Sequence, residues 1–164
     1  MNFDEILEEV KAELENTGAK TEFVESNGSK FLRAAVAFTD DAIPLPVSVN
    51  LIAASGNTVI AQIYVQITDK LSDSARTELE KLIPPLNFFG LIGTYGIFKG
   101  NELFCKYSIA LSEIEDAELR AAETFDALTV LYSFLDGTLP LLIEFVNEKM
   151  TFEQAVEKQL IQPI

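Results

Sequence analysis

The segment from Val59 to Thr68 alternates between apolar and polar side chains more regularly than any other part of the chain. Successive side chains of a β-strand point to opposite faces, so this pattern predicts a strand with one buried face and one wet face. Strands of this kind are typical of antiparallel sheets that are covered on one side only. The buried set would be Val59, Ala61, Ile63, Val65 and Ile67, and the wet set Ile60, Gln62, Tyr64, Gln66 and Thr68.

Five further segments fit the same sheet, and short turns join most of them. The turn Ser26-Asn27-Gly28-Ser29 separates the first two segments, and Asn-Gly tolerates the positive φ that a tight hairpin needs. The turn Lys99-Gly100-Asn101 separates the last two. The expected strands are Thr21–Glu25, Lys30–Phe38, Val47–Ala53, Gly93–Lys99 and Glu102–Leu111.

Apolar residues at helical spacing predict an N-terminal helix over residues 2–17, and Ser72 is placed to cap a short middle helix. That helix should reach about Ile83, because Pro84-Pro85 ends or restarts it. A long helix follows from about Glu115 to Leu135, and Gly137 and Pro140 should break it. Two shorter helices are then expected, over about Leu139–Glu148 and Phe152–Leu160, the second with a capping box of Thr151 and Gln154.

The order of these elements predicts an α+β fold, in which the helices pack on an antiparallel sheet, and argues against a doubly wound α/β fold. The helices do not alternate one-for-one with the strands. A chain of 164 residues has the length of one domain, so we expect a single domain over residues 1–164.

The charge and the residue types limit the possible functions. Twelve basic against twenty-six acidic residues give a net charge of −14, which argues against binding of nucleic acid or of an anionic membrane. Histidine, the commonest general base, is absent, and the single Cys105 cannot form an internal disulfide. No phosphate-binding or calcium-binding loop motif occurs. We therefore expect no enzyme, no catalytic residue, no cofactor and no metal.

The uncharged stretches 42–68 and 82–98 are interrupted by polar residues, or by glycine and proline, so neither predicts a membrane span. The acidic N-terminus does not have the pattern of a signal peptide. These observations predict a soluble, cytoplasmic protein that does not bind a membrane.

Residues 79–157 resemble the YbjN family, described as regulators of bacterial sensory transduction. The resemblance rests on a helix ending in Leu86-Asn87, the hairpin Gly96–Leu111, a long helix ending in Asp136 before Pro140, and the closing Phe152-Glu153-Gln154-Ala155. It implies a fold like that of the class I type III secretion chaperones, and a small acidic homodimer that holds other proteins. It implies no catalytic residue.

The long helix carries two apolar faces after Asp126, and a helix that is apolar all round is buried on both sides. One face should cover the sheet. The other needs either the following segment of the same chain or a second copy. We expect Val130, Leu131 and Phe134 at such a dimer interface. The first face would hold Ala121, Ala122, Phe125, Leu128, Tyr132 and Leu135, and the second Ala127, Val130, Leu131 and Phe134.

The wet face of the sheet is the other candidate surface. Ile52, Ile60 and Tyr64 would be partly exposed there among amide side chains, as a site for a protein segment or as an ordinary solvated face. An acidic rim around this face would favour basic partners. The sequence thus favours a chaperone-like, non-enzymatic protein-interaction or regulatory module.

The alternative is a small-molecule or lipid-binding domain. Its pocket would lie between the sheet and the long helix, walled by Phe88, Phe89, Phe98 and Phe125.

Overall fold

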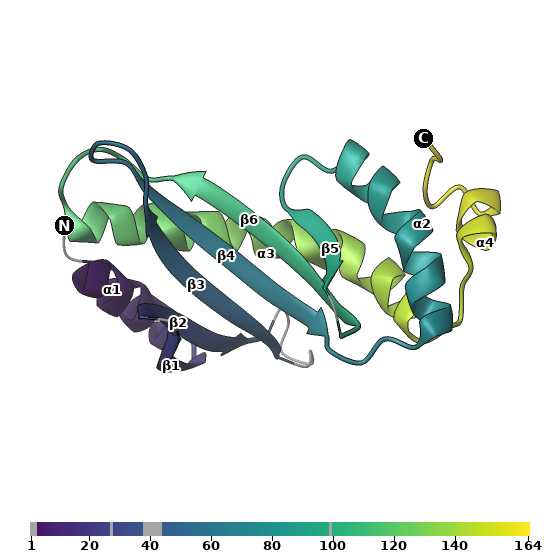
Figure 1. Cartoon of the computed structure of the whole chain (residues 1–164), viewed down its shortest axis with the longest axis horizontal. Helices are drawn as coiled ribbons and strands as arrows, with labels where there is room; N and C mark the ends of the chain where they lie inside the picture. Colours follow the sequence, from purple (N-terminus) through teal and green to yellow (C-terminus); the bar gives the residue numbers. More distant parts are fainter. Residues whose placement is uncertain (1–2, 27, 38–43, 99) are drawn as a thin grey trace. The chain divides into compact units, whose positions relative to one another are not determined.

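The computed structural model describes residues 3–26, 28–37, 44–98 and 100–164, and it has the expected α+β architecture (Figure 1). A six-stranded antiparallel sheet has the order β1-β2-β3-β4-β6-β5. The strands are β1 (Lys20–Ser26), β2 (Ser29–Val36), β3 (Leu45–Ala53), β4 (Val59–Thr68), β5 (Thr94–Phe98) and β6 (Glu102–Ala110). The helices of the described residues are α1 (Phe3–Asn16), α2 (Asp73–Phe89), α3 (Ala117–Val146) and α4 (Phe152–Glu157).

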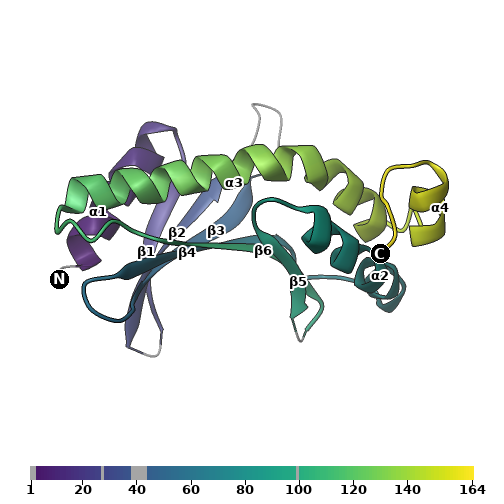
Figure 2. The same ribbon diagram turned by 90° about the horizontal axis from the view of Figure 1, so that it is seen from above.

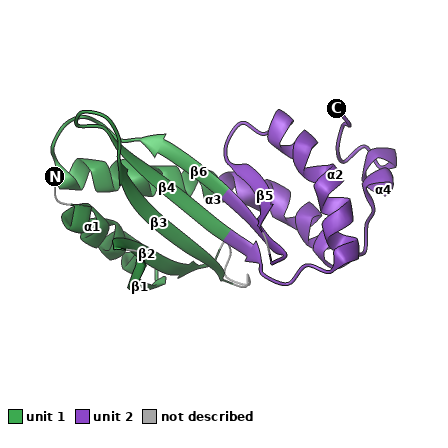
Figure 3. Cartoon of the chain, in the orientation of Figure 1, with its two compact units in different colours: residues 1–65, 106–132 green, residues 66–105, 133–164 purple. Residues whose placement is uncertain are grey.

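The chain divides into two compact units, shown in different colours in Figure 3. Unit 1 comprises residues 1–65 and 106–132, and unit 2 comprises residues 66–105 and 133–164. The elements β4, β6 and α3 each continue from one unit into the other. A single domain over residues 1–164 stays a prediction.

Unit 1 is a sheet with helices on one face. The buried and half-buried residues of β4 alternate one by one, which confirms the pattern that the sequence predicted. Helix α1 buries Ile6, Leu7, Val10 and Leu14, and with the first half of α3 it lies on one side of the strands (Figure 2). The core of the unit lies between these helices and the strand residues Leu32, Ala34, Val47, Val49, Leu51, Val59, Ala61, Ile63 and Val65.

The turns agree with the sequence where the structure describes them. Gly28, Gly100 and Asn101 have φ angles of 77°, 98° and 66°, the left-handed conformation that the two predicted hairpins require. Phe38, Asn27 and Lys99, which also belong to the predicted strands and turns, lie outside the described residues.

Helix α2 corrects the expected break at Pro84-Pro85, because it continues through both prolines to Phe89. A proline inside a helix costs about 3 kcal/mol, since it removes a backbone hydrogen bond. Leu82, Pro85 and Leu86 are all buried, and their packing offsets this cost. At the other end the predicted cap is confirmed, because the Ser72 hydroxyl accepts a hydrogen bond from the Ala75 amide at 3.0 Å.

Helix α3 corrects the second expected break. It runs without interruption for 30 residues, through Gly137 and Pro140, so no separate helix begins at Leu139. Leu135, Leu142 and Phe145 lie on its buried face on both sides of the two residues, and all three are fully buried. Helical propensity is a weak preference that such tertiary packing overrides.

By length and composition, α3 is the one helix of the described residues that would be able to cross a membrane, with a mean hydropathy of 1.4 over its most apolar window. In the sequence, residues 42–68 and 82–98 were considered as membrane spans, and the segment that forms α3 was not. Core helices of soluble proteins share the same property, so it assigns α3 to neither environment.

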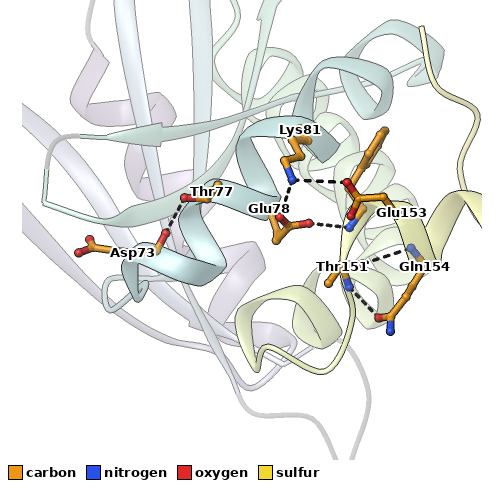
Figure 4. Close-up of polar contacts among 8 residues, drawn as sticks. Asp73, Thr77, Glu78, Lys81, Thr151, Glu153 and Gln154 are labelled. Atoms are coloured by element: carbon orange, nitrogen blue, oxygen red, sulfur yellow. Dashed lines mark hydrogen bonds and ion pairs between the residues drawn. The ribbon is translucent and has the colours of Figure 1, made fainter.

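The last helix, α4, is fixed to α2 by polar contacts within unit 2 (Figure 4). Its predicted capping box is confirmed, because Thr151 and Gln154 exchange side-chain and backbone hydrogen bonds. The Phe152 amide also donates to Glu78 Oε2 at 2.8 Å, and Lys81 Nζ lies 2.6 Å from Glu78 Oε1. These hydrogen bonds to its carboxylate lower the pKa of Glu78. The helix ends at Glu157, three residues earlier than expected.

Candidate protein-binding surface

In unit 1 the sheet face opposite α1 and α3 is the surface on which the predicted binding residues meet. Ile52 and Ile60 are directly opposite each other on β3 and β4. Two more pairs on the same face are Asn50 with Gln62 and Ser48 with Tyr64. Ile52 is exposed, and Ile60 and Tyr64 are half-buried. Over the described residues of unit 1 no helix lies on this side of the strands (Figures 1 and 2), and we call it the outer face.

A row of side chains crosses the outer face from strand to strand. Arg33 of β2 is opposite Ser48 of β3, and Ser48 is opposite Tyr64 of β4. On the next strand, the Leu111 amide donates to the Val59 carbonyl at 2.8 Å. Counting five residues along each antiparallel strand from this bond brings Lys106 beside Tyr64. We call Arg33, Ser48, Tyr64 and Lys106 the cross-strand row.

An aromatic ring lies next to one end of this row. Phe31 is two residues from Arg33 on the same strand, so both side chains are on the outer face. The guanidinium carbon of Arg33 lies 5.8 Å from the centroid of the Phe31 ring, a cation–π geometry that holds the long side chain against the sheet. Val24 of β1 is opposite Phe31 and adds apolar surface.

The described strand residues of the outer face are mostly not acidic, and the acidic rim predicted around this face stays a prediction. Lys20, Arg33 and Lys106 are exposed there, and Glu22, directly opposite Arg33, is the one carboxylate among the outward-facing residues of β1–β4 and of β6 from Lys106 to Ala110. Most acidic residues lie elsewhere, because helix starts and solvent-facing helix positions favour them. Helix α1 alone carries Asp4, Glu5, Glu8, Glu9, Glu13 and Glu15.

The sequence reasoning missed Arg33, Phe31 and Lys106 as surface residues of this face. The signal for Arg33 and Phe31 was present, because they directly flank the apolar position Leu32 in an alternating segment. Joining them to Tyr64 needed the strand register, which the sequence did not provide.

The three residues predicted for a dimer interface have different environments. Leu131 is 0% exposed, so its side chain has no surface left for a second copy. Val130 is exposed. Phe134 is half-buried, and its ring stacks on Tyr95 with 6.3 Å between the centroids. A dimer contact through Val130 and Phe134 stays a prediction.

The residues predicted to wall a pocket are mostly exposed. Phe88, Phe89 and Phe98 are 70%, 49% and 54% exposed, which does not favour rings that line a closed cavity. Phe125, the fourth predicted wall residue, is half-buried.

A hollow of about 530 Å³ occurs at another place, within unit 1. Phe3, Leu7 and Leu51 contribute its apolar lining. Asp4 and Lys30, which also line it, form an ion pair of 3.1 Å with each other. Ser29 and Asn50 also line the hollow, so its walls are polar as well as apolar.

Two of the chain's potentially reactive side chains, Cys105 and Tyr95, are buried. Cys105 is buried in β6, and burial raises the pKa of its thiol to about 12, so it holds no thiolate near neutral pH. Burial also raises the pKa of Tyr95, whose hydroxyl pairs with that of Thr138. Across the described ranges, no group of three or more Cys, Asp or Glu side chains is placed to hold a metal ion.

Comparison with known proteins finds a likeness among solved structures. No family model and no curated protein sequence matches the chain. The chain is similar to the crystal structure of YbjN, described as a putative transcription regulator from E. coli, with a TM-score of 0.43 and 17% sequence identity over 96% of both chains. Membership of the YbjN family stays a prediction.

Proposed function

We propose that the protein is a non-enzymatic interaction module that binds a segment of another protein on the outer face of unit 1. The observation that carries this proposal is the combination of exposure and composition on β3 and β4. Ile52, Ile60 and Tyr64 offer apolar contact area there, and Ser48, Asn50 and Gln62 offer hydrogen-bonding groups between them.

Such a mixture suits a reversible protein contact. Non-obligate interfaces are about as apolar as the rest of a protein surface, and tyrosine is enriched in them because one ring supplies both contact area and a polar group. A rigid sheet also holds its side chains in place before binding, which lowers the entropy lost on association. The half-buried positions of Ile60 and Tyr64 favour this arrangement.

The proposal is tested by affinity capture from a lysate of the source cells with three baits. These are the wild-type protein, Tyr64→Glu, and Thr129→Glu as a control of equal charge at an exposed position of α3. Circular dichroism melting curves establish that all three are folded. We expect the same few proteins on the wild type and on Thr129→Glu, and their loss on Tyr64→Glu.

Two results contradict the proposal. If no protein is enriched above background on the wild type, the domain is not an interaction module of this kind. If Tyr64→Glu retains the partners of the wild type, the outer face is not the binding surface.

A further inference from the structure

We infer that the segment bound on the outer face is acidic, and that two of its carboxylates are spaced to reach Arg33 and Lys106 at the two ends of the cross-strand row. The inference rests on the proposed function and adds the chemistry of the partner. The net charge of −14 alone would suggest a basic partner, whereas the inferred partner is acidic.

The basic residues of unit 1 are distributed unevenly over its surface. The sequence of the unit contains six, against sixteen acidic residues, so the unit as a whole is strongly negative. Three of these six basic residues are buried or form ion pairs within the unit. Arg120 is buried, Lys30 pairs with Asp4 at 3.1 Å, and Lys11 pairs with Glu15 at 3.0 Å.

The other three, Lys20, Arg33 and Lys106, are all exposed on the outer face. With Glu22 as the single carboxylate among its described strand residues, this face carries three positive charges against one negative charge. It is therefore a locally cationic surface on an acidic protein, and it complements an anionic partner. The acidic helices on the opposite side of the sheet would repel the same partner, which restricts it to this face.

The distance between the charges of Arg33 and Lys106 sets the spacing of the partner's carboxylates. Arg33 is on β2 and Lys106 on β6, with β3 and β4 between them. Three strand spacings of about 4.8 Å separate the two positions by about 14 Å. An extended chain lying across the strands advances about 3.3 Å per residue, so four residues cover about 13 Å.

Because side chains of an extended segment alternate, residues i, i+2 and i+4 point to the same side. Acidic residues at i and i+4 would meet Arg33 and Lys106. The residue at i+2 would then pack on Ser48 and Tyr64, and an apolar side chain fits the Tyr64 ring best. The expected motif is an acidic residue, any residue, an apolar residue, any residue and a second acidic residue.

The experiment is a selection of random peptides displayed on phage, followed by affinity measurement of the selected peptides by fluorescence anisotropy. The wild type is compared with the double variant Arg33→Glu/Lys106→Glu. A matched control, Lys149→Glu/Lys158→Glu, reverses two exposed lysines of unit 2, so both variants change the net charge by −4, from −14 to −18. If circular dichroism shows that Arg33→Glu/Lys106→Glu is unfolded, the milder Arg33→Gln/Lys106→Gln is used in its place.

We expect the wild type and the control to enrich peptides with two acidic residues at i and i+4. The double variant should bind these peptides about tenfold more weakly or worse, because two exposed attractions become repulsions. It should itself select basic residues at the same spacing.

The remaining outcomes separate this inference from the proposed function. Enrichment of peptides without an acidic preference, or equal loss of affinity in the control, overturns the inference and leaves the interaction module intact. If no peptide is enriched on the wild type, both are overturned. Binding of a 20-nucleotide single-stranded DNA by the wild type and not by the double variant would assign the face to nucleic acid and overturn both.

Discussion

Arg120 is the one charged side chain that is buried among the described residues, with 2% of its surface exposed. Its Nε donates to the Ser112 carbonyl at 2.9 Å, and its Nη2 donates to the Asn57 carbonyl at 3.1 Å. These bonds join the first turn of α3 to the loop after β6 and to the turn between β3 and β4. We therefore expect Arg120→Ala to destabilise unit 1 strongly.

The size of the effect follows from the two hydrogen bonds. Each bond from a charged donor is worth about 1.5–3 kcal/mol, so about 3–6 kcal/mol of interaction is lost. Two effects oppose this loss. A buried guanidinium carries a desolvation penalty that the substitution removes, and Asn57 is exposed, so water can replace the donor to its carbonyl. We expect a net fall of about 2–4 kcal/mol in the free energy of unfolding, or roughly 5–15 °C in Tm.

The matched control is Arg76→Ala in unit 2. Arg76 also donates two side-chain hydrogen bonds, to Glu80 Oε1 at 2.8 Å and to Asn101 Oδ1 at 3.0 Å, but 37% of its side chain is exposed. Its loss should cost less than about 1 kcal/mol, because solvent screens the ion pair. Urea unfolding followed by circular dichroism measures both variants. Equal losses in the two, or a loss below about 1 kcal/mol for Arg120→Ala, would refute the argument from burial.

Four other predictions follow from single residues. Burial raises the pKa of Cys105 from 9.0 to about 12, so between these pH values only the unfolded chain ionises this thiol. The free energy of unfolding should therefore fall by up to about 1.4 kcal/mol per pH unit above pH 9. Urea titrations of Cys105→Ala at several pH values should lack this part of the pH dependence. Thr151→Ala removes the capping box of α4 and should cost about 1 kcal/mol in the same assay, whereas no loss would mean that the helix does not depend on its cap. A Cβ at Gly137 meets no atom within 4 Å, so Gly137→Ala should stabilise α3 by about 0.5–1 kcal/mol in thermal unfolding. A Cβ at Gly96 would lie 2.6 Å from the Phe104 ring, so Gly96→Ala should destabilise the chain by about 1–3 kcal/mol; the same sign of change for both glycine variants would contradict the reasoning.

The strands of this protein were the most predictable part of the fold, since their pattern depends on local alternation. The β4 pattern alone gave the buried and half-buried residues in the correct order. The caps at Ser72 and Thr151 were equally local, because a hydroxyl followed three residues later by a backbone amide is a short-range interaction.

Helix interruptions were predicted wrongly because they depend on non-local packing. Proline and glycine lower the helical propensity of their own positions, and the sequence shows this cost directly. It does not show that Leu82 and Leu86 on one helix, or Leu135 and Leu142 on the other, are buried on both sides of the break. Burying each such side chain yields about 1.5–3 kcal/mol. Two leucines therefore offset the single Pro140 of α3, whereas the two prolines of α2 need the buried Pro85 as well as Leu82 and Leu86.

The charge of the outer face illustrates a different limit of sequence reasoning. Net charge is a sum over the whole chain, whereas a partner meets only the groups on the surface that it contacts. In unit 1 the acidic residues follow the helices, as the six on α1 show, because helix starts and solvent-facing positions select for them. The strands carry few acidic residues, and the register places the exposed Arg33 in line with Ser48 and Tyr64. A sheet with acidic helices on one face only therefore keeps a cationic surface on the other, and the partner that fits this surface has the same sign of charge as the protein as a whole.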